Sequence, residues 1–188
     1  REAGYEIFEQ RRKGIRFGYI EAWPQIVGDV VITFSPDGNS VPEAIPELID
    51  KMREGYDMVI ASRYKDDAHS EDDTVFTGFG NWLFTRTINW LHGGKYTDAM
   101  VIYRAYRKSL FEELDLHLDS GYRTPEILFR TVLGIEPLLS VRASKRKRSI
   151  AEIPADEPHR IGGTAKLQMV RWGLGYYFQV WREAFFWK

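Results

Sequence analysis

The chain has 188 residues, of which 44% are hydrophobic and 28% charged, so it is long enough for one sizeable core and too apolar for a mainly disordered protein. Its 26 lysines and arginines nearly balance 27 aspartates and glutamates, and this charge predicts no nucleic-acid partner. The absence of cysteine excludes disulfides and thiolate chemistry, and it fits a cytoplasmic location. P-loop, HExxH, GxSxG and GxGxxG patterns are absent, which argues against zinc-protease and serine-hydrolase chemistry.

The middle of the chain predicts a β-strand, an α-helix and a second β-strand. Residues 30–34 are a short β-branched run, followed by the turn-forming sequence Ser-Pro-Asp-Gly-Asn. Ser40 and Glu43 then have the spacing of a capping box, and apolar residues recur at helical intervals after them. Residues 58–61 form a second apolar run. This pattern is typical of a βαβ unit, and it predicts an α/β fold with a mostly parallel sheet flanked by helices.

Two charged side chains directly follow the predicted strands. A right-handed crossover makes such strands parallel, so Asp37 and Arg63 are expected to face the same crevice at the carboxyl edge of the sheet. Oxygen donors such as Asp37 and Asn39 suit Mg²⁺ or Mn²⁺, and an arginine can bind phosphate oxygens with two parallel hydrogen bonds. The sequence therefore predicts a site for a metal-bound, phosphate-bearing ligand. The simpler alternative is a solvated turn aspartate and a surface arginine.

Six short segments follow one another along the chain and together form a pattern. They are residues 13–18, 28–31, 35–39, 60–64, 97–107 and 153–166. Each is weak alone, but in this order they resemble the family 2 glycosyltransferases of the GT-A fold, near the dolichol-phosphate mannosyltransferases and polyprenyl-phosphate sugar transferases. The resemblance implies an incomplete GT-A-like domain over residues 1–163 that lacks its first strands. An aromatic, amphipathic helix is expected over residues 164–188.

The resemblance also implies a function and a set of site residues. The function is metal-dependent, inverting transfer of a hexose from a nucleotide-sugar donor (UDP- or GDP-hexose) to a polyprenyl or dolichyl phosphate or another glycan or lipid acceptor. Asp37 and Asn39 would bind the Mg²⁺ or Mn²⁺ ion, and Asp98 would be the catalytic group near the sugar. The donor and acceptor phosphates would be held by Arg63, Arg104, Arg160 and Lys166.

Other interpretations of these residues remain open. For Asp98 and Arg104 the equally weighted alternative is a buried ion pair that supports the sheet, and Arg160 and Lys166 are typical of a solvated loop. Ser35 stands where the family usually has the first carboxylate of its metal motif, which would weaken metal binding. The alternative function is that of a non-catalytic, glycosyltransferase-like fragment that acts as a binding or scaffolding module within a homo-oligomer.

The C-terminal stretch is rich in aromatic residues. Its predicted helical face consists of Leu167, Val170, Leu174, Tyr177, Phe178, Trp181 and Phe185. Arginines are interspersed with these residues, and this composition is typical of a helix that lies in a membrane interface. It predicts a peripheral protein at the inner face of the membrane. Packing on the domain core or on another subunit is the alternative.

Overall fold

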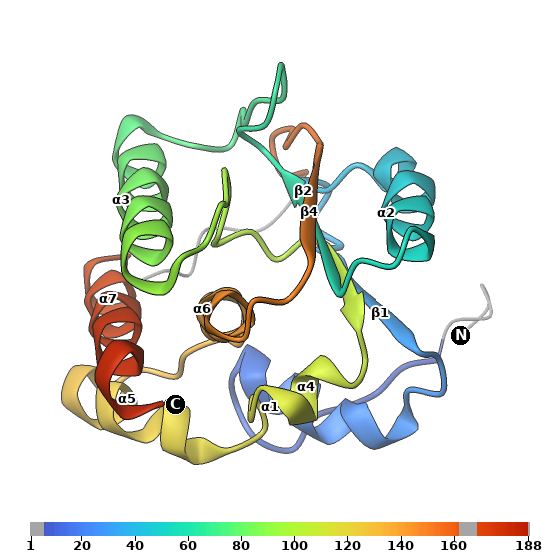
Figure 1. Ribbon diagram of the computed structural model, residues 1–188. Helices are drawn as coiled ribbons and strands as arrows, with labels where there is room; N and C mark the ends of the chain where they lie inside the picture. The colour runs from blue at the N-terminus through green and yellow to red at the C-terminus, as the bar shows by residue number, and fades with distance from the viewer. Residues whose placement is uncertain (1–5, 162–168, 188) are drawn as a thin grey trace.

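The computed structural model describes residues 6–161 and 169–187. Within these residues, four strands form one sheet in the order β1-β3-β2-β4 (Figure 1). The strands are β1 (Val30–Thr33), β2 (Met58–Ser62), β3 (Arg104–Arg107) and β4 (Ile150–Pro154). The α-helices are α1 (Ile15–Ala22), α2 (Ile45–Arg53), α3 (Val75–His92), α4 (Leu110–Glu113), α5 (Arg123–Phe129), α6 (Glu136–Lys145) and α7 (Met169–Phe186). Short 3₁₀ turns cover Trp23–Gln25, Pro42–Ala44 and Asp119–Gly121.

The sheet is mixed. Strand β2 pairs in parallel with β4, whereas β3 pairs antiparallel with both β1 and β2. Strands β1, β2 and β4 therefore run in one direction and β3 runs in the other. The predicted α/β class is confirmed, and the architecture is consistent with a GT-A-like fold. The two strands of the predicted βαβ unit do run the same way, but they are not neighbours because β3 lies between them.

Helices cover both faces of the sheet. Helix α2 packs on one face, and α6 lies on the other with α3 and α7 outside it (Figure 1). Every residue of β2 is buried, as expected for an apolar strand covered on both sides. Nine of the ten residues of α6 are also buried, because the sheet and the outer helices surround it.

The helix after β1 begins differently from the prediction. The capping box expected from Ser40 and Glu43 does not form, since neither the 3₁₀ turn nor α2 has a side-chain hydrogen bond at its N-cap. Both elements have a proline at one of their first two positions. Proline has no N–H group and a φ angle already suited to a helix, so these two starts have fewer donors that a cap must satisfy.

Helix α7 has an inner face that packs against α3, α5 and α6. Val180 and Gln179 are buried there, and Glu183 forms a buried ion pair with Arg142 of α6, with 2.8 Å between Arg142 Nε and Glu183 Oε2. The inner face thus packs on the core, one of the two predicted alternatives. The predicted boundary between residues 163 and 164 lies outside the described residues. In the described part of the chain, we find no helix with the length and apolar character that crossing a membrane requires.

A buried carboxyl group at the start of α6 provides a test of the packing. Glu136 is buried, receives a hydrogen bond from the Tyr19 hydroxyl at 3.2 Å, and has no ion-pair partner among the described residues. Burial raises the pKa of Glu136. Folding raises the pKa of this carboxyl, so the folded protein is most stable at a pH where the group is protonated in both the folded and the unfolded state. This stability is lost as the pH rises through the folded-state pKa.

We therefore expect Glu136→Gln to increase the free energy of unfolding at neutral pH by about 1–3 kcal/mol, the usual desolvation penalty of a buried polar group. The gain should vanish at acidic pH, where the wild-type carboxyl is already protonated. Urea unfolding at the two pH values measures both effects. Glu126→Gln is the control and should destabilise, because Glu126 pairs with Arg16. A loss of stability in Glu136→Gln at neutral pH would contradict the prediction.

Candidate functional site

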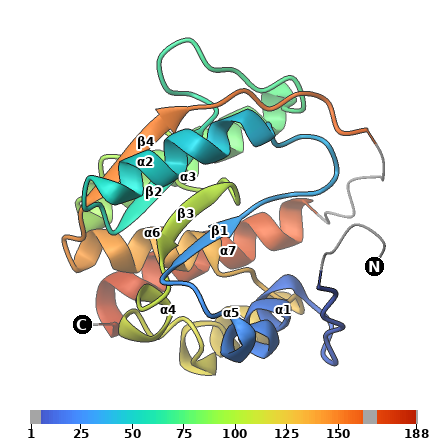
Figure 2. The same cartoon turned by 90° about the vertical axis from the view of Figure 1, so that its right-hand side faces the viewer.

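One edge of the sheet collects segments from four parts of the sequence. The carboxyl ends of β1, β2 and β4 lie at this edge, and so does the amino end of β3 because β3 runs antiparallel. Figure 2 shows the segments that follow β1 and β4 leaving the sheet on the same side. The charged and amide side chains here form what we call the edge cluster. It consists of Asp37, Asn39, Arg63, Asp72, Asp73, Asp98, Glu157 and Arg160.

Arg63 is the centre of the edge cluster. Its Nε and Nη2 atoms donate to the two oxygens of Asp98 at 2.7 and 3.2 Å, in a bidentate arrangement. Its Nη1 atom donates to Glu157 at 3.0 Å. The Arg63 side chain is 14% exposed and that of Asp98 is fully buried. Burial alone would lower the pKa of Arg63, but the charges of Asp98 and Glu157 outweigh it and raise the pKa.

Asp98 is held from several directions. Besides the two bonds from Arg63, its Oδ1 atom accepts the backbone N–H groups of Met100 and Val101 at 3.3 and 3.2 Å. The carboxylate is therefore fixed in place by the chain that follows it. Asp98 pairs with Arg63 and not with Arg104, so the alternative of an Asp98–Arg104 ion pair is wrong.

The segment after β1 joins the same cluster through two contacts. Asn39 donates from Nδ2 to Glu157 at 3.2 Å. Asp37 accepts the Ser35 hydroxyl at 2.7 Å and lies 3.9 Å from Arg160. Arg160 in turn pairs with Asp72, and this hydrogen bond raises the pKa of Arg160 and lowers that of Asp72. The cluster therefore connects the predicted residues of four different segments.

One predicted phosphate-binding residue, Arg104, is not part of this cluster. Arg104 is fully buried, and its guanidinium donates to the backbone oxygen of Val101 and, at 2.9 Å, to the Ser140 hydroxyl of α6. As placed, it offers no exposed atom to an acceptor phosphate, and it supports the core instead. Lys166 lies outside the described residues.

Three acidic residues of the cluster were missed by the sequence analysis. Asp72 and Asp73 belong to an acid-rich loop that is typical of solvated surface. Glu157 follows β4, which the sequence analysis did not identify as a strand. Had residues 150–154 been assigned as a strand, the rule that places side chains at the carboxyl edge would also have placed Glu157 there.

The oxygen atoms after β1 fit a divalent cation. Asn39 is buried, and its Oδ1 atom has no hydrogen-bond partner among the described residues. The Asp37 side chain is 31% exposed. Such hard oxygen donors suit Mg²⁺ or Mn²⁺. Over residues 6–161 and 169–187, no three His, Asp or Glu side chains converge on a preformed metal site, so phosphate oxygens and water would have to complete the coordination.

The sequence pattern of one known family covers most of this edge. The sequence model of glycosyl transferase family 2 matches residues 4–115, which is more than half of the chain and includes Asp37, Asn39, Arg63 and Asp98. The chain belongs to glycosyl transferase family 2. The resemblance found in the sequence motifs is thereby confirmed.

Curated members of the family show which enzymes this family 2 chain is similar to. It is 27% identical over 165 residues to an undecaprenyl-phosphate 4-deoxy-4-formamido-L-arabinose transferase of Klebsiella pneumoniae (strain 342), covering 88% of the chain and 44% of the relative. It is 27% identical over 164 residues to a dolichyl-phosphate hexose transferase of Haloferax volcanii, covering 87% of the chain and 65% of the relative. The chain thus spans less than half of the first relative and less than two thirds of the second.

The contacts of Asp98 predict a large effect on stability in this family 2 domain. Asp98→Ala leaves Arg63 without its bidentate partner and unpairs the N–H groups of Met100 and Val101. Breaking a buried ion pair by removing one partner costs about 3–5 kcal/mol, and we expect a loss of that size in urea unfolding. The exposed Asp67 provides the control, since Asp67→Ala should change stability by less than about 0.5 kcal/mol. Equal effects of the two substitutions would show that the Asp98 contacts do not stabilise the domain.

Proposed function

We propose that this chain forms part of the catalytic domain of a glycosyltransferase that moves a hexose from a nucleotide-sugar to a polyprenyl or dolichyl phosphate. The observation that carries the proposal is the convergence of Asp37, Asn39, Arg63 and Asp98 at one sheet edge. Similarity to transferases named for undecaprenyl phosphate and dolichyl phosphate supports the acceptor class.

The charge of the edge cluster supports a requirement for a divalent cation. Among the described residues, the cluster combines five carboxylates with only two guanidinium groups. A bare diphosphate would be repelled by such a surface. A divalent ion bound by Asp37 and Asn39 would offset most of this excess negative charge and, as a Lewis acid, stabilise charge on the departing nucleoside diphosphate.

The remaining residues of the cluster then receive distinct roles. Arg63 and Arg160 would bind phosphate oxygens, each exchanging a carboxylate partner for the ligand. Asp98 would lie beside the sugar or the attacking group. A phosphate acceptor is already ionised and does not need a general base to remove a proton. Asp98 would therefore act chiefly by orienting Arg63. Lys166 remains a proposed phosphate ligand on the basis of the family resemblance alone.

Donor binding gives a direct test. UDP-glucose and GDP-mannose are titrated calorimetrically into the chain with and without Mn²⁺, and we expect binding of one of them only with Mn²⁺. Asp37→Ala should weaken it at least tenfold, which corresponds to about 1.4 kcal/mol. The control is Asp67→Ala, an exposed acid of the neighbouring loop, which should bind as the wild type does.

A different result would favour the non-catalytic alternative. If neither donor binds to this chain or to an N-terminally extended chain, the proposed transfer reaction is wrong and a binding or scaffolding module is the better description. Binding that is independent of Mn²⁺ and insensitive to Asp37→Ala would contradict the metal role alone.

A lipid-linked acceptor requires the site to approach a membrane, and the outer surface of α3 and α7 fits one. We call it the α3–α7 face. Its exposed apolar side chains are Val75, Phe76, Phe79, Trp82, Trp90, Val170, Leu174, Phe178, Trp181, Phe185 and Phe186. Trp90 and Trp181 join the two helices through an edge-to-face contact with 6.0 Å between ring centroids.

The charges on these helices favour anionic lipid over a protein partner. Helix α3 contains no acidic residue, and the only acid of α7, Glu183, is buried against Arg142. Arg86 and Arg171 are exposed beside the apolar residues. Aromatic side chains with flanking arginines are typical of a surface in the headgroup region of a bilayer. We therefore propose peripheral attachment through the α3–α7 face, at the cytoplasmic surface of the membrane.

Vesicle flotation tests this attachment. The chain should float with phosphatidylcholine vesicles that contain phosphatidylglycerol, and less with phosphatidylcholine alone. Replacing both Trp82 and Trp90 with Ala should weaken binding at least tenfold, since burying one large apolar side chain contributes about 1.5–3 kcal/mol. The control combines Ile7→Ala with Val27→Ala, which removes exposed apolar groups away from these helices. If the wild type does not bind vesicles but self-associates, and the tryptophan variant no longer self-associates, the α3–α7 face would instead be the interface of a homo-oligomer.

A further inference from the structure

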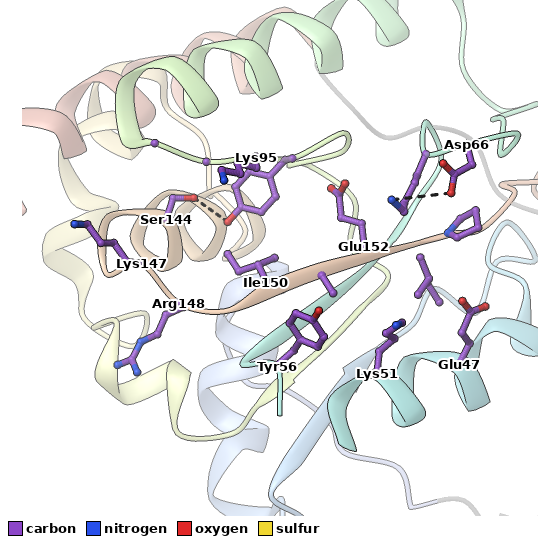
Figure 3. Close-up of a pocket in the computed structure, with 17 residues that line it drawn as sticks. Glu47, Lys51, Tyr56, Asp66, Lys95, Ser144, Lys147, Arg148, Ile150 and Glu152 are labelled. Carbon is purple, nitrogen blue, oxygen red and sulfur yellow. Dashed lines mark hydrogen bonds and ion pairs between the residues drawn. The ribbon is translucent and has the colours of Figure 1, made fainter. Parts of the chain in front are cut away.

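Glu152, a carboxylate outside the edge cluster, accepts hydrogen bonds from the backbone of Thr97 and Asp98. Glu152 lies in the middle of β4, where it lines a cavity of about 940 Å³ along the outer side of that strand (Figure 3). Its oxygens accept the Thr97 N–H at 2.9 and 3.0 Å and the Thr97 hydroxyl at 2.7 Å. They also accept the Asp98 N–H at 3.2 Å.

These bonds act on the residues immediately before the Asp98 side chain. The Thr97 hydroxyl also contacts the Ser62 hydroxyl at 2.6 Å, at the end of β2, directly before Arg63. Glu152 therefore fixes the start of the segment that leads into β3 against the end of β2. The two halves of the Arg63–Asp98 pair are brought together at this junction.

The geometry suits an ionised carboxylate, whose single negative charge is shared by its two oxygens. Two N–H groups and one hydroxyl converge on the Glu152 carboxylate, and an ionised carboxylate accepts all of them. Glutamine has nearly the same shape but carries no charge. With its oxygen toward the two N–H groups, its NH₂ group would meet the Thr97 hydroxyl, which would then have to accept this bond and turn its own proton toward the Ser62 hydroxyl. Burial raises the pKa of Glu152, while its hydrogen bonds with Thr97 and Asp98 oppose that shift and favour the charged form.

We propose that Glu152 is a positioning residue, which holds the Thr97–Asp98 backbone so that the Asp98 carboxylate meets the Arg63 guanidinium. The link from this pair to sugar transfer rests on the proposed function, whereas the positioning itself does not. The experiment therefore measures the Arg63–Asp98 contact directly and measures ligand binding separately.

The direct measurement is the Arg63 Nε–H signal in the ¹⁵N-labelled chain. This proton is bonded to Asp98 at 2.7 Å, so its chemical shift and its exchange with water report on the pair. Asp98→Asn identifies the signal of a weakened pair. We expect Glu152→Gln to move the Arg63 signal toward that of Asp98→Asn and to speed its exchange at least tenfold.

Glu47→Gln is the matched control. Glu47 lines the same cavity but does not contact Thr97 or Asp98, so the Arg63 signal should be unchanged. An unchanged Arg63 signal in Glu152→Gln would overturn the proposal. If Glu152→Gln does not fold, Thr97→Val removes one of the donors with a smaller perturbation and should shift the signal in the same direction, by less. No shift in that variant would also overturn it.

The second measurement separates positioning from a purely structural role. In the calorimetric titration with Mn²⁺, Glu152→Gln should weaken binding of UDP-glucose or GDP-mannose about tenfold, and Glu47→Gln should not. A shifted Arg63 signal with unchanged affinity would confirm that Glu152 positions the pair and would contradict the link from the pair to donor binding. If the wild-type chain binds neither donor, the proposed function fails, and the Arg63 signal still decides whether Glu152 positions the pair.

Discussion

The bidentate contact between Arg63 and Asp98 is the interaction on which the edge of the sheet depends. Arg63 follows β2 and Asp98 precedes β3, so this one pair joins two antiparallel neighbours just beyond their last backbone pairing. Both charges are largely withdrawn from water, and either one left alone would be strongly destabilising. Glu157, which follows β4, bonds to the same guanidinium, and Asn39, which follows β1, is attached through Glu157. The Arg63 guanidinium is therefore the centre around which the edge cluster is organised.

That arrangement determines what the proposed anionic ligands would require at a surface rich in carboxylates. Asp98, Glu157 and Asp73 neutralise Arg63, and Asp72 and Asp37 neutralise Arg160. Without a further cation, a diphosphate would gain two guanidinium contacts only by displacing carboxylates of the same charge. A divalent ion changes the balance, because it binds oxygens of the protein and of the phosphates together. Cation and diphosphate are thus expected to bind as one unit, each weakly without the other.

Local signals in the sequence were sufficient for some elements and not for others. The apolar run at β1, the apolar run at β2 and the turn with Asp37 are local features, so their positions follow from periodicity and turn chemistry. The insertion of β3 between those strands depends on long-range pairing, which no local pattern encodes. Arg104 is an example of a residue that was misassigned for this reason. No neighbouring sequence feature indicates that its side chain faces α6, where it donates hydrogen bonds to the Ser140 hydroxyl and to backbone carbonyl oxygens. Glu157 and Glu152 were missed for the related reason that β4 is short and only partly apolar.

Helix α6 connects the two surfaces that the proposed reaction would use. On one side, Ser140 accepts from Arg104 and donates to Ala99, which fixes the segment between Asp98 and β3. On the other side, Arg142 anchors α7 through Glu183, so that the apolar side chains of α7 are directed outward. Because α6 is buried almost throughout, neither contact can move far without opening the core. The edge cluster and the α3–α7 face are thereby held at a fixed relative position. A polyprenyl phosphate has its chain in the bilayer and its reactive phosphate at the surface, so it needs such a fixed relation between an apolar face and a charged site.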